Sequence, residues 1–213
     1  MFSAFHSFDA FFYDIAHSLH QTAADRIITP IATVASFLGD NGYVWIFLAL
    51  ILLLFKKTRK IGCIVAGALV LDVIVVNGLL KVFIDRPRPW VQGDFDFITR
   101  EYVQQRLVSI PGDSSFPSGH TASSFAAAFA LLPALQKKQK LWFIPAILLA
   151  CIIAASRIYV CVHYPSDVFA GILIGTVIGI AAYFIANAIY KWLEKSGKFP
   201  KFYQIINGEK WGI

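Results

Sequence analysis

The segment at 156–167 reads SRIYVCVHYPSD and separates two long apolar runs. Ionisable side chains at the junction of two membrane-like helices are energetically out of place, and such groups usually have a function. Pro165 disfavours helix at Tyr164 and suits the first turn of a new helix. Asp167 then lies in that first turn, from where its carboxylate can reach back to His163. A histidine held by a carboxylate is the arrangement of an oriented base or nucleophile.

The apolar runs on both sides of this segment predict an all-α, polytopic transmembrane bundle. Hydrophobic residues make up 57% of the chain and the mean hydropathy is +0.63, which argues against a soluble domain. A length of 213 residues allows one domain of five to six spans, at about 20 apolar residues each. The formal net charge is +6, but the basic residues gather at the ends of the apolar runs. This distribution predicts a lipid bilayer as the partner and excludes nucleic acid.

The apolar runs divide the single domain, residues 1–213, into three parts. We expect an N-terminal amphipathic or re-entrant segment at 1–41, a helical bundle at 42–192 and a basic tail at 193–213. The first span can extend backward through the apolar stretch at 27–38, which is too short to cross a membrane by itself. The expected spans lie at about 42–55, 61–84, 118–135, 141–159 and 165–192.

The first 25 residues predict an amphipathic helix that lies in the membrane interface. Its apolar residues recur at steps of three and four: Phe2, Phe5, Phe8, Phe12, Ile15 and Leu19. Histidines at positions 6, 17 and 20 suggest a metal site, but no cysteine or second cluster completes one. We therefore expect no metal site in this helix.

Two further motifs precede the segment at 156–167. Residues 81–89 read KVFIDRPRP and residues 117–120 read PSGH. The three stretches, in this order, give K-x6-RP, PSGH and SR-x5-H-x3-D. This set resembles the type 2 phosphatidic acid phosphatase superfamily, the integral membrane lipid phosphatases, and every fixed position of the three motifs is matched. The resemblance covers the chain from Lys81 to Asp167.

The motif residues offer the groups that phosphate chemistry needs. Lys81, Arg88 and Arg157 are three cations that can neutralise phosphate oxygens as charge redistributes. Ser118 is expected to cap the helix that follows Pro117, whose free N–H groups form an anion site. Gly119 would let the backbone approach the phosphate closely. The sequence therefore predicts one phosphate site built from these five residues.

The resemblance implies a two-step reaction without a metal or other cofactor. His163 would attack phosphorus and form a phosphohistidine, and Asp167 would orient it. His120 would protonate the leaving group and could later activate water. The absence of a carboxylate cluster in the sequence agrees with metal-independent chemistry.

The basic clusters predict how the chain is oriented. If the expected spans alternate, the clusters at 56–60 and 137–140 and the C-terminal tail all lie on one side, which the positive-inside rule makes cytoplasmic. All three motifs then lie on the other face. We expect a multi-pass protein of the cell membrane with an extracytoplasmic active site and a cytoplasmic C-terminus.

A small bundle with an extracytoplasmic phosphate site favours undecaprenyl diphosphate as the substrate. Phosphatidylglycerophosphate or phosphatidic acid is the alternative, and a lipid phosphotransferase would use the same residues. A transporter or channel would need charged residues along several spans, whereas only Asp72 lies deep. A soluble phosphatase or haloperoxidase shares the motifs but not the apolar spans. The sequence does not predict the oligomeric state.

Several residues outside the motifs have ordinary interpretations. Arg86 does not fit the spacing from Lys81, so we expect a loop or headgroup contact for it. Asp72 lies in mid-span and must be paired or protonated, and a hydrogen bond to a neighbouring helix is the favoured interpretation. Gly171, Gly175 and Gly179 recur every four residues, which predicts close helix packing.

Overall fold

The computed structural model describes residues 2–93, 95–99, 103–104, 111–197, 200, 203 and 205. All regular secondary structure in these residues is helical, as predicted. The N-terminal half contains η1 (Phe2–Phe5), α1 (His6–His20), α2 (Asp25–Gly39), η2 (Asp40–Gly42), α3 (Tyr43–Leu54), α4 (Arg59–Asp72), η3 (Val73–Leu80), α5 (Lys81–Ile84) and α6 (Pro89–Gln92). The C-terminal half contains α8 (Gly119–Ala134), η4 (Lys137–Trp142), α9 (Phe143–Tyr159) and α10 (Pro165–Ser196).

Among the residues that the structure describes, four helical segments are long and apolar enough to cross a membrane: Asp25–Leu54, Arg59–Gln92, Lys140–Tyr159 and Pro165–Ser196. The protein is therefore a multi-pass membrane protein. The first span includes the preceding apolar stretch, so the extended version of the predicted 42–55 span is the one the structure has. The predicted span at 118–135 corresponds to α8, which has 16 residues and is not among the four. Four of the predicted five to six spans are therefore confirmed, and the predicted span at 118–135 is not one of them.

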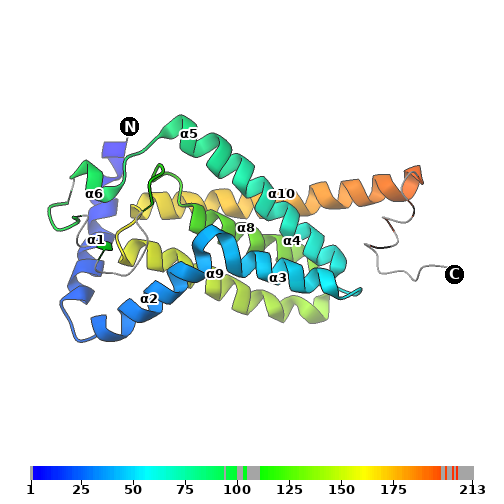
Figure 1. Ribbon diagram of the computed structural model, residues 1–213, viewed down its shortest axis with the longest axis horizontal. Helices are drawn as coiled ribbons and strands as arrows, with labels where there is room; N and C mark the ends of the chain where they lie inside the picture. The colour runs from blue at the N-terminus through cyan, green and yellow to red at the C-terminus, as the bar shows by residue number, and fades with distance from the viewer. Residues whose placement is uncertain are drawn as a thin grey trace.

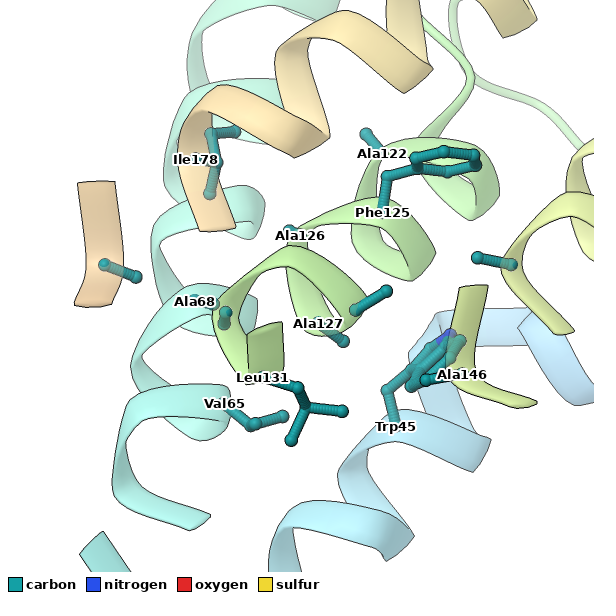
Figure 2. Packing of buried hydrophobic residues seen from close by; sticks show 14 of the residues in the cluster. Trp45, Val65, Ala68, Ala122, Phe125, Ala126, Ala127, Leu131, Ala146 and Ile178 are labelled. Carbon is teal, nitrogen blue, oxygen red and sulfur yellow. The ribbon is translucent and has the colours of Figure 1, made fainter. Parts of the chain in front are cut away.

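Helix α8 lies inside the bundle, where it packs against α4, α9 and α10 (Figure 1). Its alanines let the neighbouring helices come close, and Ala122, Ala126 and Ala127 are fully buried. Figure 2 shows this core, in which Trp45 of α3 reaches toward α8. The indole N–H of Trp45 donates a hydrogen bond to Ser124 Oγ at 2.9 Å. Because protein covers α8 on most sides, its residues need not be as apolar as those of a lipid-facing span.

The predicted close packing of the α10 glycines is confirmed. A Cβ atom on Gly175 would lie 2.3 Å from the carbonyl oxygen of Ala122, and one on Gly179 would lie 2.4 Å from that of Ala126. Both distances are far below van der Waals contact. The backbones of α8 and α10 therefore touch along this stripe, and the contact fixes the PSGH motif relative to the segment at 156–167.

The first span is broken between α2 and α3. Asn41 (φ 48°) and Gly42 (φ 70°) have left-handed backbone conformations, which end one helix and redirect the next. Non-helical backbone at membrane depth is tolerated where it is buried in protein or lines a cavity. The break lines the cavity described below.

Helix α1 crosses the end of the bundle at a steep angle to the long helices (Figure 1). Its buried residues are Asp9, Tyr13 and Ala16, whereas Phe8 and Ile15 of the predicted apolar stripe are exposed. The face with Asp9, Tyr13 and Ala16 therefore packs against the bundle, whereas Phe8 and Ile15 point outward and Leu19 packs against the core. This arrangement suits a helix that is bathed in lipid on its outer side. Most of the predicted basic tail, including Lys198, Lys201 and Lys210, lies outside the described residues.

Candidate active site

His163 lies in the short connection between α9 and α10, and its side chain is almost completely buried. Its Nδ1 atom is 2.8 Å from the carbonyl oxygen of Ser115, which can only accept a hydrogen bond. Its Nε2 atom is 3.0 Å from Nη1 of Arg88, which can only donate. These partners assign the proton to Nδ1 and leave the lone pair on Nε2.

Burial lowers the pKa of His163 well below its ordinary value, and the positive charges of Arg88, Arg157 and Lys81 lower it further. The ring is therefore neutral at neutral pH. A neutral imidazole with its Nε2 lone pair directed at an arginine is chemically able to act as a nucleophile.

Asp167 lies in the first turn of α10, and Pro165 occupies the first position of that helix, both as predicted. Its Oδ2 atom is 3.8 Å from Nδ1 of His163, which is too long for a hydrogen bond. Oδ2 instead accepts hydrogen bonds from Ser115 Oγ at 2.5 Å and from the Tyr164 N–H at 3.1 Å. Ser115 thus contacts both residues, through its carbonyl to His163 and through its hydroxyl to Asp167.

Arg86 is buried, so the expected headgroup contact is wrong, whereas its backbone does contact the loop before α8 at Ser114 and Ser115. Its Nη1 atom donates to Oδ1 of Asp167 at 2.5 Å, and its Nη2 atom donates to Oδ2 of Asp9 at 3.1 Å. Asp9 also accepts a hydrogen bond of 2.7 Å from the backbone N–H of Ser166. Tyr13, one turn further along α1, donates to the carbonyl oxygen of His163 at 2.8 Å. The hydrogen bonds of Asp9 and Tyr13 therefore attach helix α1 to the 163–167 segment.

The three predicted phosphate-binding cations line the same cavity as His163. The carboxylate of Asp113 bridges two of them, contacting Lys81 and lying 2.5 Å from Nη2 of Arg88. Burial alone would raise the pKa of Asp113, but the hydrogen bonds and charges of Lys81 and Arg88 hold it below its ordinary value. Arg157 is buried and bonds to Ser36, while its Nε atom has no hydrogen-bond partner among the described residues. The cluster of Lys81, Arg88 and Arg157 therefore still has an N–H group, at Nε of Arg157, that can donate to a phosphate oxygen.

The PSGH motif opens α8, but Ser118 does not cap it. Ser118 occupies the N-cap position, yet its Oγ atom accepts a hydrogen bond from Thr121 Oγ1 at 3.0 Å and makes no side-chain bond to the helix backbone. The nearest protein atoms to a Cβ on Gly119 would be Asn77 Oδ1 at 3.7 Å and Lys81 Nζ at 3.8 Å. The N-terminus of α8 therefore faces Lys81, as a phosphate site requires.

His120, one residue into α8, contacts a carboxylate that the sequence analysis did not single out. Its Nε2 atom lies 2.7 Å from Oδ1 of Asp40, which belongs to the break between α2 and α3. Asp40 could have been suspected because it is an acidic residue inside an apolar stretch, but its partner is 80 residues away.

These groups meet at a cavity of about 970 Å³. Of the eight predicted site residues, six line it: Lys81, Arg88, Gly119, His120, Arg157 and His163. Ser118 and Asp167 are fully buried behind its wall. The cavity continues between α3 and α4, where Leu50, Leu53, Leu69 and Val73 give it an apolar wall. A polar end and an apolar extension suit a phosphorylated lipid.

Asp72 lies on the wall of the same cavity and is buried. Its Oδ1 atom has no hydrogen-bond partner in the described part of the chain, so the expected bond to a neighbouring helix is not seen for that atom. The residue directly precedes η3, a π-helical stretch within the second span. Such stretches are often found at functional sites.

A metal centre finds no support in the residues that the structure describes. They contain no group of three or more His, Cys, Asp or Glu side chains that could hold a metal ion.

Comparison with known proteins gives a family and several relatives. The family model described as PAP2 superfamily matches residues 61–191. The chain is 35% identical over 172 residues to an undecaprenyl-diphosphatase of Sulfolobus acidocaldarius, covering 80% of this chain and 74% of the relative. It is 28% identical over 169 residues to a lipid A 4′-phosphatase of Porphyromonas gingivalis, covering 75% and 69%. The crystal structure of Aquifex aeolicus LpxE matches with a TM-score of 0.56 and 29% identity, covering 80% of this chain and 91% of that one.

Proposed function

Because the chain belongs to the PAP2 superfamily and is a membrane lipid phosphatase, we propose that it hydrolyses undecaprenyl diphosphate at the extracytoplasmic face. One observation carries this proposal. Three cations and two histidines line one cavity that continues into an apolar groove between α3 and α4. The cations can bind a phosphorylated headgroup while the groove receives the first part of the hydrocarbon tail.

In the proposed first step, Nε2 of His163 attacks the terminal phosphorus, and the bond between that phosphorus and the bridging oxygen breaks. The bridging oxygen takes a proton from His120, so the products of this step are undecaprenyl phosphate and a phosphohistidine. The Nη1 atom of Arg88, now 3.0 Å from Nε2 of His163, must turn its N–H toward a phosphate oxygen to free the lone pair. Arg157 and Lys81 offer further donors to the phosphate oxygens.

In the second step, water attacks the phosphohistidine with His120 as the base, which releases phosphate and restores His163. Asp167 is assigned an indirect role. Because Ser115 contacts both residues, we propose that the Asp167 carboxylate fixes the loop whose carbonyl orients the His163 ring. Every charge needed for this scheme is supplied by side chains, so the reaction requires no metal.

The proposed face of the membrane follows from charge. If α8 also crosses the membrane, the chain has five spans. The basic residues then lie on the side opposite the cavity: the cluster at 56–60, Lys137 and Lys140, and Lys191 and Lys195 at the end of α10. The positive-inside rule makes that side cytoplasmic. The diphosphate is favoured over a monoester because a site with three cations can bind its second phosphate as well. The 35% identity to an undecaprenyl-diphosphatase supports the same choice.

A side-by-side assay tests the proposal. The kcat/KM for undecaprenyl diphosphate is compared with that for phosphatidylglycerophosphate and phosphatidic acid in the same detergent micelles, with excess chelator present. We expect undecaprenyl diphosphate to be preferred, the chelator to have no effect, vanadate to inhibit and His163→Ala to be inactive. A preference for either glycerolipid would reject the assigned substrate, and transfer of phosphate to another lipid instead of water would reject hydrolysis. Loss of activity in chelator that one divalent ion restores would reject the metal-free mechanism.

A further inference from the structure

We propose that Asp40 is a positioning residue for His120, and that the break between α2 and α3 brings its carboxylate to the proton donor. The inference rests on the proposed function in one respect, namely that His120 protonates the leaving oxygen. It adds a residue outside the three motifs to the machinery of that step.

The contact itself is short and specific. Nε2 of His120 lies 2.7 Å from Oδ1 of Asp40, and the two side chains are only 18% and 29% exposed. Because a carboxylate can only accept, Nε2 carries the proton in this pair. The other ring nitrogen, Nδ1, makes no hydrogen bond within the described residues. Nδ1 is therefore the atom available to the leaving oxygen.

The residue before Asp40 shows how closely the chain passes the ring. A Cβ atom on Gly39 would lie 2.9 Å from Cδ2 of His120 and 2.7 Å from Cγ2 of Ile153. Any larger residue would push the turn away from both. Gly39 thus lets the end of α2 contact the imidazole directly, and the next residue places its carboxylate on the ring.

The positive charges around His120 explain why a carboxylate beside its ring is needed. His120 lies in the first turn of α8, where the helix dipole opposes a positive charge. Lys81 and Arg157 line the same cavity and oppose it as well. A proton donor must nevertheless carry a second ring proton before the reaction. Among the described residues, Asp40 is the carboxylate that hydrogen-bonds the ring, so it favours the protonated form.

We explain the backbone break between α2 and α3 in the same way, as the feature that brings Asp40 to His120. Asn41 and Gly42 interrupt a membrane-spanning helix with left-handed conformations, and irregular backbone at this depth is tolerated beside a cavity. Gly39, Asp40, Asn41 and Gly42 all line the cavity that contains His120 and His163.

The proton balance of the step is simple. Nδ1 of protonated His120 gives its proton to the leaving oxygen as the phosphorus–oxygen bond breaks, and the ring becomes neutral. Nε2 keeps its proton and its hydrogen bond to Asp40 throughout. Asp40 contacts neither the phosphate nor the leaving group in this scheme, so it acts only through His120.

The test compares two leaving groups. For wild type, Asp40→Asn and Asp40→Glu, kcat/KM is measured with the preferred lipid substrate and with an aryl phosphate. This parameter includes only steps up to departure of the leaving group, so hydrolysis of the phosphohistidine does not enter it. General acid catalysis contributes about 10²–10⁴-fold. We therefore expect Asp40→Asn to lose about tenfold to a hundredfold with the lipid and less than about threefold with the aryl phosphate, whose leaving oxygen scarcely needs a proton.

Two controls complete the experiment. Asp40→Glu keeps a carboxylate and should recover part of the loss with the lipid. In a His120→Ala background, Asp40→Asn should cause no further loss, because the group it acts through is gone. The ratio of the two substrates is taken on one protein sample, so a partly misfolded variant does not change it.

Equal losses with both substrates, or a full additional loss in the His120→Ala background, would overturn the proposal and make Asp40 a structural residue. The result is separable from the substrate assignment. If the wild-type enzyme prefers a glycerolipid phosphate, the same ratio is measured with that lipid, and the role of Asp40 is judged independently.

Discussion

His163 combines deep burial with the neighbourhood of several cations, and both features keep its ring neutral. For a nucleophile this is useful, because a protonated imidazole has no lone pair to attack phosphorus. The same surroundings stabilise the negative phosphate that must come close to it. In the proposed mechanism, the charges that disfavour protonation of the ring become ligands of the phosphate oxygens once phosphorus is bound.

The pH dependence of kcat/KM tests this property of His163. Burial and the cations lower the pKa of His163 well below 6.5, so activity that needs the neutral ring is present at neutral pH and is lost only when the pH falls through the lowered pKa. We expect the acidic limb assigned to His163 to lie well below pH 6.5. The second ionisation of phosphate, near pH 6, is separated by titrating the substrate alone with ³¹P NMR. An enzyme limb near 6.5 would contradict the neutral, buried nucleophile.

The sequence predicted the site residues whose spacing is local, and it missed those whose role depends on distant partners. Pro165 and Asp167 lie where the sequence analysis placed them, because the start of a helix is determined within a few residues. Arg86 was misjudged because its two carboxylate partners are 77 and 81 residues away. Ser118 is an exception, because it does not cap the helix although its actual partner, the hydroxyl of Thr121, is only three residues away. Assignment of the catalytic roles themselves remains a prediction.

At the scale of elements, helix α1 is attached to the 163–167 segment by buried polar contacts. Asp9 is the centre of these contacts, since it bonds to Arg86 and to both the N–H and the hydroxyl of Ser166. The apolar periodicity of this helix does not reveal that the carboxylate of Asp9 lies on its buried face. The helix therefore helps to fix the start of α10 in addition to contacting lipid.

Asp9→Asn tests this attachment. The substitution removes the negative charge that faces Arg86 and places an amide N–H where an acceptor is needed. Hydrogen bonds to charged groups are worth about 1.5–3 kcal/mol, so we expect a lower thermal midpoint in detergent and reduced kcat. Asp14→Asn, on the exposed side of the same helix, removes the same charge and should change neither. Equal behaviour of the two variants would show that the α1 contact does not support the site.

The stripe of contact between α8 and α10 is the second element-level feature. It brings His120 on α8 and Asp167 on α10 into one assembly, because the two backbones touch near their N-terminal ends. The four-residue repeat of glycines was sufficient to predict this packing. It did not indicate the partner, which is identified only by the three-dimensional arrangement.

Gly175→Ala measures how much this contact matters. The new methyl group would lie 2.3 Å from a backbone oxygen of Ala122, so α8 and α10 must separate. Overpacking of this kind costs about 1–3 kcal/mol, and we expect a lower thermal midpoint and lower kcat. Gly67→Ala is the matched control, since a Cβ there meets nothing within 4 Å and alanine favours the helix. A Gly175→Ala protein as stable and active as Gly67→Ala would contradict a tight α8–α10 contact.

At the scale of the whole molecule, hydropathy predicted the long helices but not how the chain uses them. The four lipid-facing spans have large exposed side chains, for example Phe47, Val70, Leu148 and Leu173, which is what a bilayer requires. The span at 118–135 was predicted by the same rule, but α8 is buried and alanine-rich for a different reason, namely helix packing. The break at 39–42 lies within a span and beside His120, and this position depends on contacts distant in the sequence.

The last prediction concerns the proposed orientation of the chain in the membrane. In a background without the native cysteines, a cysteine is introduced at Asp96, in the loop on the side of the cavity, or at Lys137, in the connection between α8 and α9. Both positions are exposed in the structure. If five crossings alternate and basic residues stay inside, a membrane-impermeant thiol reagent should label position 96 in intact cells and position 137 only after permeabilisation.

The two sites also count the crossings. Asp96 and Lys137 flank α8, so opposite labelling requires that α8 crosses the membrane, although it is not among the four long apolar spans. Labelling of both positions from the same side would mean that α8 is re-entrant. The reverse pattern would place the cavity on the cytoplasmic side, and extracytoplasmic hydrolysis of undecaprenyl diphosphate would then be excluded while the cavity and its proposed chemistry remain.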